Sequence, residues 1–60
     1  MPLVTLRIDI DEDDASAGKI FAMLDELESH IETAADHNEV EVNSLDADWI
    51  DGEGTNCWSP

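Results

Sequence analysis

The feature that most constrains this chain is a helical repeat of apolar residues between Ala15 and His37. Apolar side chains recur there at steps of three and four residues, which places them on one stripe of an α-helix. The stripe comprises Ile20, Leu24, Leu27, Ile31 and Ala34/Ala35, widened by Phe21 and Met23. The pattern predicts one amphipathic helix that packs this stripe on a core and turns its other sides to water.

Other stretches alternate with the period of a β-strand. Residues 3–10 place Val4, Leu6, Ile8 and Ile10 on one face, and residues 39–43 repeat the pattern with Val40 and Val42. Residues 47–51, around Trp49, predict a third short strand, and residues 52–54 a turn. Residues 55–58 form either a short fourth strand or a tail that lays Trp58 on the core.

The order β-α-β-β predicts an α+β fold with one amphipathic helix packed on a three- to four-stranded, mostly antiparallel sheet. Sixty residues correspond to one small domain, 1–60, without room for a deep pocket. Asp13, Asp14 or Ser16 is expected to cap the helix start. Asn38 is expected to adopt the left-handed conformation that ends the helix.

The negative charge of the chain is unusually high for its length. Sixteen acids stand against two bases, Arg7 and Lys19, which gives a formal net charge of −14. A hydrophobic content of 42% with clear periodicity indicates a folded domain and not a disordered acidic tail. Because self-repulsion weakens a compact state, we expect the charge to serve a function. Repulsion between like charges disfavours nucleic acid and anionic membranes and favours a basic protein as the partner.

The cellular location is predicted from three features. The single cysteine, Cys57, excludes an internal disulfide and fits a reducing compartment. The start of the chain lacks the basic and apolar regions of a signal peptide. No apolar stretch approaches the ~20 residues that span a bilayer. We therefore expect a protein in the cytoplasm of a host cell.

Metal and cofactor sites are not expected. Asp9-x-Asp11-x-Asp13 has the opening spacing of a calcium-binding EF-hand loop, but Asp14 replaces the required glycine and Ile20 the required glutamate. His30 and His37 lie seven residues apart, whereas chelating pairs favour four. The simpler interpretation is two surface histidines and, for Cys57, a small buried thiol.

An enzyme is not expected either. Acid–base catalysis by paired carboxylates needs one carboxyl group desolvated in a cleft, and nearly all acids here fall at positions that face water. Neither histidine belongs to a motif with serine or cysteine that would activate a nucleophile.

The acids themselves are the candidate binding residues. Four acids at steps of three or four residues line one helix face: Asp25, Glu28, Glu32 and Asp36. A second cluster precedes the helix: Asp11, Glu12, Asp13 and Asp14. Four helical residues rise about 6 Å and phosphates along one DNA strand are about 3.4 Å apart, so the two spacings are of the same order. Each carboxylate would replace a phosphate opposite an arginine or lysine of the partner.

Further acids lie outside these two groups. Glu39 and Glu41 are expected to extend the charge over the solvent side of the sheet. A third cluster is formed by Asp46, Asp48, Asp51 and Glu53.

Small size, high acidity and an α+β build together resemble the DNA-mimic inhibitors of phages and mobile elements, among which the small anti-CRISPR proteins are closest in size. The resemblance implies a steric inhibitor that fills a positively charged DNA-binding site. One such site is where a CRISPR effector complex reads the short flanking motif or duplex of its target. A restriction enzyme, nuclease or glycosylase would be a variant target.

Two alternatives remain open. The acids could serve only as a solvating coat, as in a salt-loving organism, in which case they should be spread evenly. The chain could also be a protein-interaction module, such as an antitoxin for a basic toxin, anchored by Trp49 or Trp58. The simpler role of both tryptophans is to fill the core.

Overall fold

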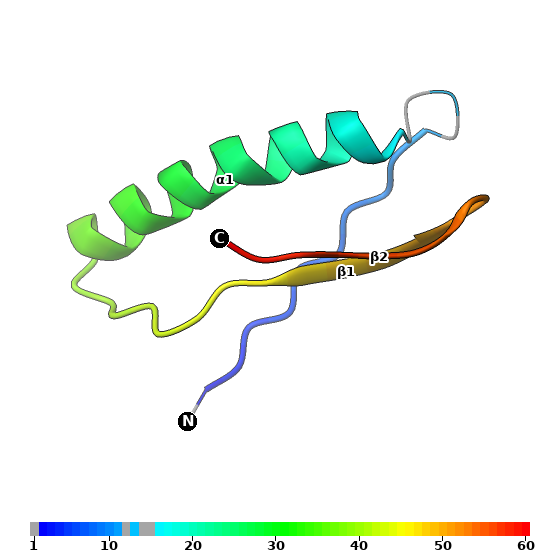
Figure 1. The fold of residues 1–60 in the computed structure, drawn as a ribbon. Coiled ribbons are helices and arrows are strands. Elements are labelled where there is room, and N and C mark those ends of the chain that lie inside the picture. Colours follow the sequence, from blue (N-terminus) through cyan, green and yellow to red (C-terminus); the bar gives the residue numbers. More distant parts are fainter. Residues whose placement is uncertain (1, 12, 14–15) are drawn as a thin grey trace.

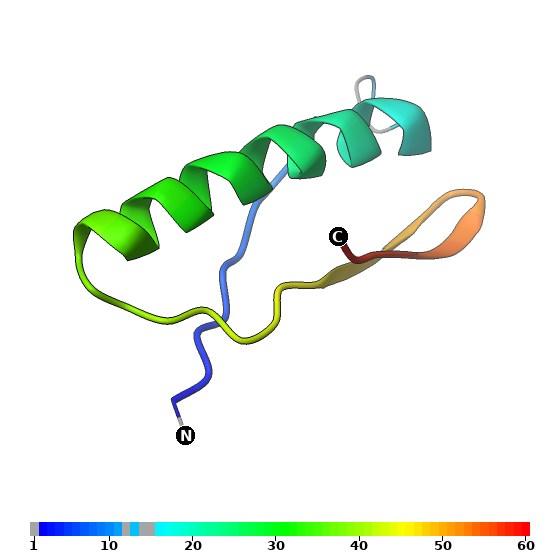
Figure 2. The ribbon, with the colours of Figure 1, turned by 60° about the vertical axis from the view of Figure 1, so that its left-hand side comes forward.

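In a computed structural model of the protein, the described residues form one helix and one β-hairpin (Figure 1). The structure describes residues 2–11, 13 and 16–60. Helix α1 spans Ala17–His37, strand β1 spans Ala47–Asp51 and strand β2 spans Gly54–Trp58. The helix lies over one face of the hairpin, so the fold has two layers (Figure 2). The N-terminal segment passes from the helix start to the far side of the hairpin.

The predicted α+β class is confirmed, but the predicted three to four strands are wrong for the described residues, which form a two-stranded antiparallel sheet. Residues 3–10 form no strand and pair with no other described residues, and Leu3 is 91% exposed. Alternation specifies which side chains share a face of a strand, but a strand also needs a neighbour for its N–H and C=O groups. Within the part of the chain that the structure describes, no strand pairs with this segment.

The predicted strand at 39–43 is also absent, and the end of α1 supplies the reason. The N–H of Val40 donates to the carbonyl of Ala35 at 2.8 Å, and the N–H of Glu39 donates to Asp36 at 3.2 Å. These two bonds form the Schellman motif that closes a helix. Val40 therefore completes the helix end and does not begin a sheet ladder.

The left-handed residue of this helix end is Glu39, with φ 59°, and not Asn38 as predicted. Asn38 has φ −100° and ψ 7°. At the other end, Ser16 occupies the N-cap position in an extended conformation, but its side chain makes no capping hydrogen bond. Asp13 lies outside the cap position, and Asp14 lies outside the described residues.

The hairpin follows the sequence closely. Its register pairs Ala47 with Trp58 and Asp51 with Gly54, so the predicted strand at 47–51 is confirmed and residues 55–58 belong to a strand. The predicted turn is confirmed, and Asp51 holds it by accepting hydrogen bonds from the N–H of Glu53 at 2.8 Å and from Nδ2 of Asn56 at 2.9 Å. Gly54 closes the turn at φ 131°, which L side chains rarely adopt.

The core is small and lies between α1 and the hairpin. Ile20, Leu24 and Trp58 are buried, and six further residues pack around them: Phe21, Met23, Leu27, Leu45, Ala47 and Trp49. The rings of Phe21 and Trp49 meet edge to face with centroids 5.3 Å apart. Both tryptophans therefore take the core-filling role that the sequence suggested.

Candidate partner-binding site

The four acids predicted to line one helix face do so in α1. With 3.6 residues per turn, Asp25, Glu28, Glu32 and Asp36 fall on one flank beside the buried stripe, spread along about 16 Å of the axis. The same geometry places Lys19, His30 and His37 on the opposite flank. Glu28 is half-buried, whereas the other three acids are exposed. The helix therefore has an acidic flank and a mixed flank, on which Glu26 lies among the basic and histidine side chains.

Asp25 ends this acidic flank at the hairpin. Its Oδ1 accepts a hydrogen bond from Nε1 of Trp58 at 2.9 Å. A carboxylate acceptor makes a stronger hydrogen bond than a neutral one. Asp25 thus has a structural role that its place in the sequence did not indicate, and one of its two oxygens is already engaged.

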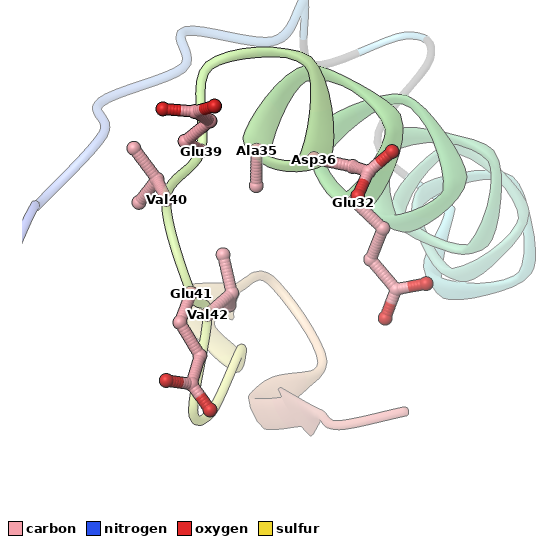
Figure 3. A pocket seen from close by; sticks show the side chains of 7 residues that line it. All are labelled: Glu32, Ala35, Asp36, Glu39, Val40, Glu41 and Val42. Carbon is pink, nitrogen blue, oxygen red and sulfur yellow. The ribbon is translucent and has the colours of Figure 1, made fainter.

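The other end of the acidic flank opens into a hollow of about 510 Å³ (Figure 3). Its lining combines three apolar and four acidic side chains: Ala35, Val40 and Val42 with Glu32, Asp36, Glu39 and Glu41. Figure 3 shows Ala35 and Val42 pointing toward one another, with the glutamate carboxylates around the margin. Glu39 and Glu41 follow α1 and lie across the hollow from Glu32 and Asp36 (Figure 3), on residues that were predicted to form a strand.

We call these six acids the acidic ridge: Asp25, Glu28, Glu32, Asp36, Glu39 and Glu41. Its last two members were not among the predicted contact residues, and they were expected on the solvent side of the sheet. One feature of the sequence does indicate that the helix ends in this way. Val40, three residues after His37, provides the apolar side chain that commonly follows a Schellman helix end.

Glu39 occupies this site at a cost to the fold. A left-handed backbone costs a residue other than glycine roughly 1–2 kcal/mol. A negative side chain at a helix C-terminus is also opposed by the helix dipole. Glycine would remove both penalties. Strained residues of this kind tend to lie at functional sites, which directs attention to the hollow beside Glu39.

The hollow is suited chemically to a lysine or arginine side chain of a partner. The methylene stem of such a side chain packs on apolar groups while its charged end remains polar. Ala35, Val40 and Val42 would receive the stem, and the surrounding carboxylates would receive the charge. Within the described part of the chain, no group of three or more His, Cys, Asp or Glu residues is arranged to hold a metal ion.

The second predicted cluster lies at the opposite end of α1 from the hollow. Asp11 and Asp13 are exposed before the start of α1, and the N–H of Asp13 donates to Oδ1 of Asp11 at 3.4 Å. Glu12 and Asp14 lie outside the described residues. Because the 21 residues of α1 span about 31 Å, Asp11 and Asp13 are separated from the hollow by the length of the helix.

The third predicted cluster is divided between structural and exposed positions. Asp51 is engaged in the hairpin turn, whereas Asp46, Asp48 and Glu53 are exposed. Cys57 is exposed on the outer face of the hairpin, so the prediction of a buried thiol is wrong. The burial pattern of β2 alternates, and Cys57 falls between the inward residues Asn56 and Trp58.

Comparisons with known proteins found no relative: no family model, no curated protein and no solved structure matches the chain. Among the described residues, no helix has the length and apolar character needed to cross a membrane.

Proposed function

We propose that the protein is a nucleic-acid mimic that inhibits a DNA-binding protein by occupying its basic site. The linear density of charge carries this proposal. The net charge is −14 and the molecule is 38 Å long. Dividing the length of 38 Å by the 14 charges gives one negative charge per about 2.7 Å. Duplex DNA carries one charge per about 1.7 Å of axis, and one strand carries one per about 3.4 Å. The protein falls between these two values.

The acidic ridge is the surface that would face the partner. Neighbouring acids on its helical part are separated by about 4.5–6 Å of rise, and the hollow adds carboxylates around an apolar floor. Each carboxylate would accept hydrogen bonds from an arginine or lysine that otherwise binds a phosphate. Such a contact blocks DNA sterically and needs no reaction.

The uneven distribution of charge favours mimicry over a solvating coat. Four of the five acids of α1 lie on one flank, whereas Lys19, His30 and His37 lie on the other together with the fifth acid, Glu26, and residues 2–8 contain no acid. A coat that only keeps the protein hydrated has no need for this separation. The position of Glu39 supports the same conclusion, because a coat would not require an acid at a strained site.

The antitoxin alternative receives less support from the arrangement of the tryptophans. An interface anchor needs an exposed large side chain that enters a pocket of the partner. Trp58 is 6% exposed and bonded to Asp25, and Trp49 packs on Phe21. The class of target that we propose is therefore a protein with a duplex-binding channel, such as a CRISPR effector complex, a restriction enzyme, a nuclease or a glycosylase.

Affinity capture from a host lysate tests this function. The immobilised protein should retain a basic DNA-binding protein at low salt, and free duplex DNA should release it by competing for the same site. Raising the salt concentration from about 50 mM to about 200 mM should weaken the complex at least about tenfold, because the contacts are between charges. A captured protein that duplex DNA does not displace, or whose affinity does not change with salt, would contradict the proposal.

A further inference from the structure

The N-terminal segment exposes more apolar surface than a small folded chain usually does. Five of its aliphatic side chains are exposed, from Leu3 at 91% and Val4 at 89% through Leu6 at 66% to Ile8 at 45% and Ile10 at 37%. Exposure falls steadily toward the helix, so the segment is docked only at its C-terminal end. Contiguous apolar surface of this kind marks an interaction site.

Beside this segment runs an open groove of about 870 Å³. Leu6, Ile8 and Ile10 form one wall, β1 forms the other, and α1 contributes Ile20, Met23 and Leu24. The edge of β1 that faces away from β2 has no strand partner among the described residues. Alternate residues of an edge strand direct their N–H and C=O groups outward, where they can pair with an added strand.

The groove also has polar residues that favour a particular occupant. Four acids lie along it: Asp13, Asp48, Asp51 and Glu53. A suitable occupant is therefore an extended segment with apolar side chains, a positive charge and no acid.

Residues 3–8 of the chain have all of these properties. They alternate with a strand period, contain Arg7 and contain no acid. Arg7 is 88% exposed, and its weak pair with Asp9, at 3.9 Å, leaves it accessible. We infer that two copies of the protein form a symmetric dimer in which residues 3–8 of each copy add as a strand to the free edge of β1 in the other.

This arrangement is closed and self-complementary. Residues 3–8 of each copy fill the groove of the other copy, and the two segments lie side by side at the two-fold axis. Both copies therefore contribute the same surface to the interface. The aliphatic side chains that are exposed in one chain become buried between the two. The groove and the hollow at the end of α1 share no lining residue, so the dimer leaves that hollow open.

Sedimentation equilibrium of the full chain at about 100 µM tests the inference. A dimer is expected, and it should become tighter between about 50 mM and about 500 mM salt, because salt screens the repulsion between two chains of charge −14. The proposed complex with a basic partner should instead weaken as salt is added. The dimer and the partner complex can therefore be tested independently of each other. A monomer under both conditions would overturn the dimer.

Variants then locate the interface. The double change Leu6→Thr and Ile8→Thr should weaken the dimer at least tenfold, and Thr5→Pro should do so by removing a strand N–H. Val40→Thr, at a side chain that is 58% exposed and lies outside the groove, is the control and should leave the dimer as tight as in the wild type. At a concentration low enough to keep the wild type monomeric, circular dichroism of each variant should match that of the wild type, since these side chains are exposed in the single chain. A dimer that withstands both N-terminal variants would contradict the inference.

An NMR sample that mixes ¹³C-labelled and unlabelled protein distinguishes strand pairing between two chains from pairing within one chain. The experiment records only nuclear Overhauser effects between a labelled and an unlabelled chain. Contacts between residues 3–8 and residues 47–51 should appear in this spectrum. If they appear only within one chain, the segment folds back on its own β1 and the inference is wrong.

Discussion

Nε1 of Trp58 donates a hydrogen bond of 2.9 Å to Oδ1 of Asp25, and this bond joins the last residue of β2 to the middle of α1. Trp58 is also one of the three buried apolar residues among those described. The hairpin and the helix are thus held together at one point by a ring that contributes both apolar contact and a directed polar bond. Asp25, a candidate for partner binding, therefore also stabilises the fold.

A double-mutant cycle with Asp25→Ala and Trp58→Phe should reveal this bond. Each single change should lower the free energy of unfolding, and the two should be coupled by about 1 kcal/mol, because either one removes the same hydrogen bond. The measurement is thermal unfolding, in which 1 kcal/mol shifts the Tm of a domain this small by about 4–8 °C. Strictly additive effects would show that the bond contributes nothing.

Replacing Glu39 with glycine should stabilise the protein. The left-handed backbone at φ 59° costs a side-chain-bearing residue roughly 1–2 kcal/mol, and glycine adopts it freely. We expect the free energy of unfolding to rise by about 1 kcal/mol. Glu39→Gln is the matched control, because it removes the charge at the helix C-terminus but keeps the strain. A glycine variant no more stable than the glutamine variant would rule out strain at this position. If Glu39 contacts the partner, both variants should bind it more weakly.

The two glycines that flank Glu53 should respond differently to alanine. Gly54 has φ 131°, so Gly54→Ala should destabilise the hairpin by about 1–3 kcal/mol through backbone strain. Added methyl groups would meet no atom within 4 Å at either glycine, so steric overlap is not the cause. Gly52→Ala is the control and should leave the Tm nearly unchanged. Equal shifts for the two variants would contradict this explanation.

Charge reversal on the acidic ridge should abolish partner binding and leave the fold intact. The test variant combines Glu28→Lys, Glu32→Lys and Asp36→Lys. The control variant combines Glu26→Lys, Asp46→Lys and Asp48→Lys, which change the net charge equally away from the ridge. Affinity for the captured DNA-binding protein should be lost in the first variant and largely kept in the second. Equal losses would indicate that only the total charge matters, as in a solvating coat.

Local chemistry alone was enough to predict several elements. The helix was expected over 15–37 and spans Ala17–His37, because its apolar stripe repeats with the period of the helix itself. The hairpin strand at 47–51 and the turn after it were predicted from alternation and glycine. The acidic flank of α1 was predicted for the same reason, since residues three or four apart in a helix are neighbours.

Features that depend on contacts between residues distant in the sequence were decided only by the tertiary structure. Residues 3–10 have the alternation of a strand, yet they lack a neighbouring ladder, and no local pattern reveals whether one exists. Glu39 became the left-handed residue because Val40 bonds back to Ala35, which moved Glu39 and Glu41 from a predicted strand to the ridge. The bond between Trp58 and Asp25 joins residues 33 positions apart. The chain itself determined its charge and its local periods, whereas packing determined which charges became neighbours.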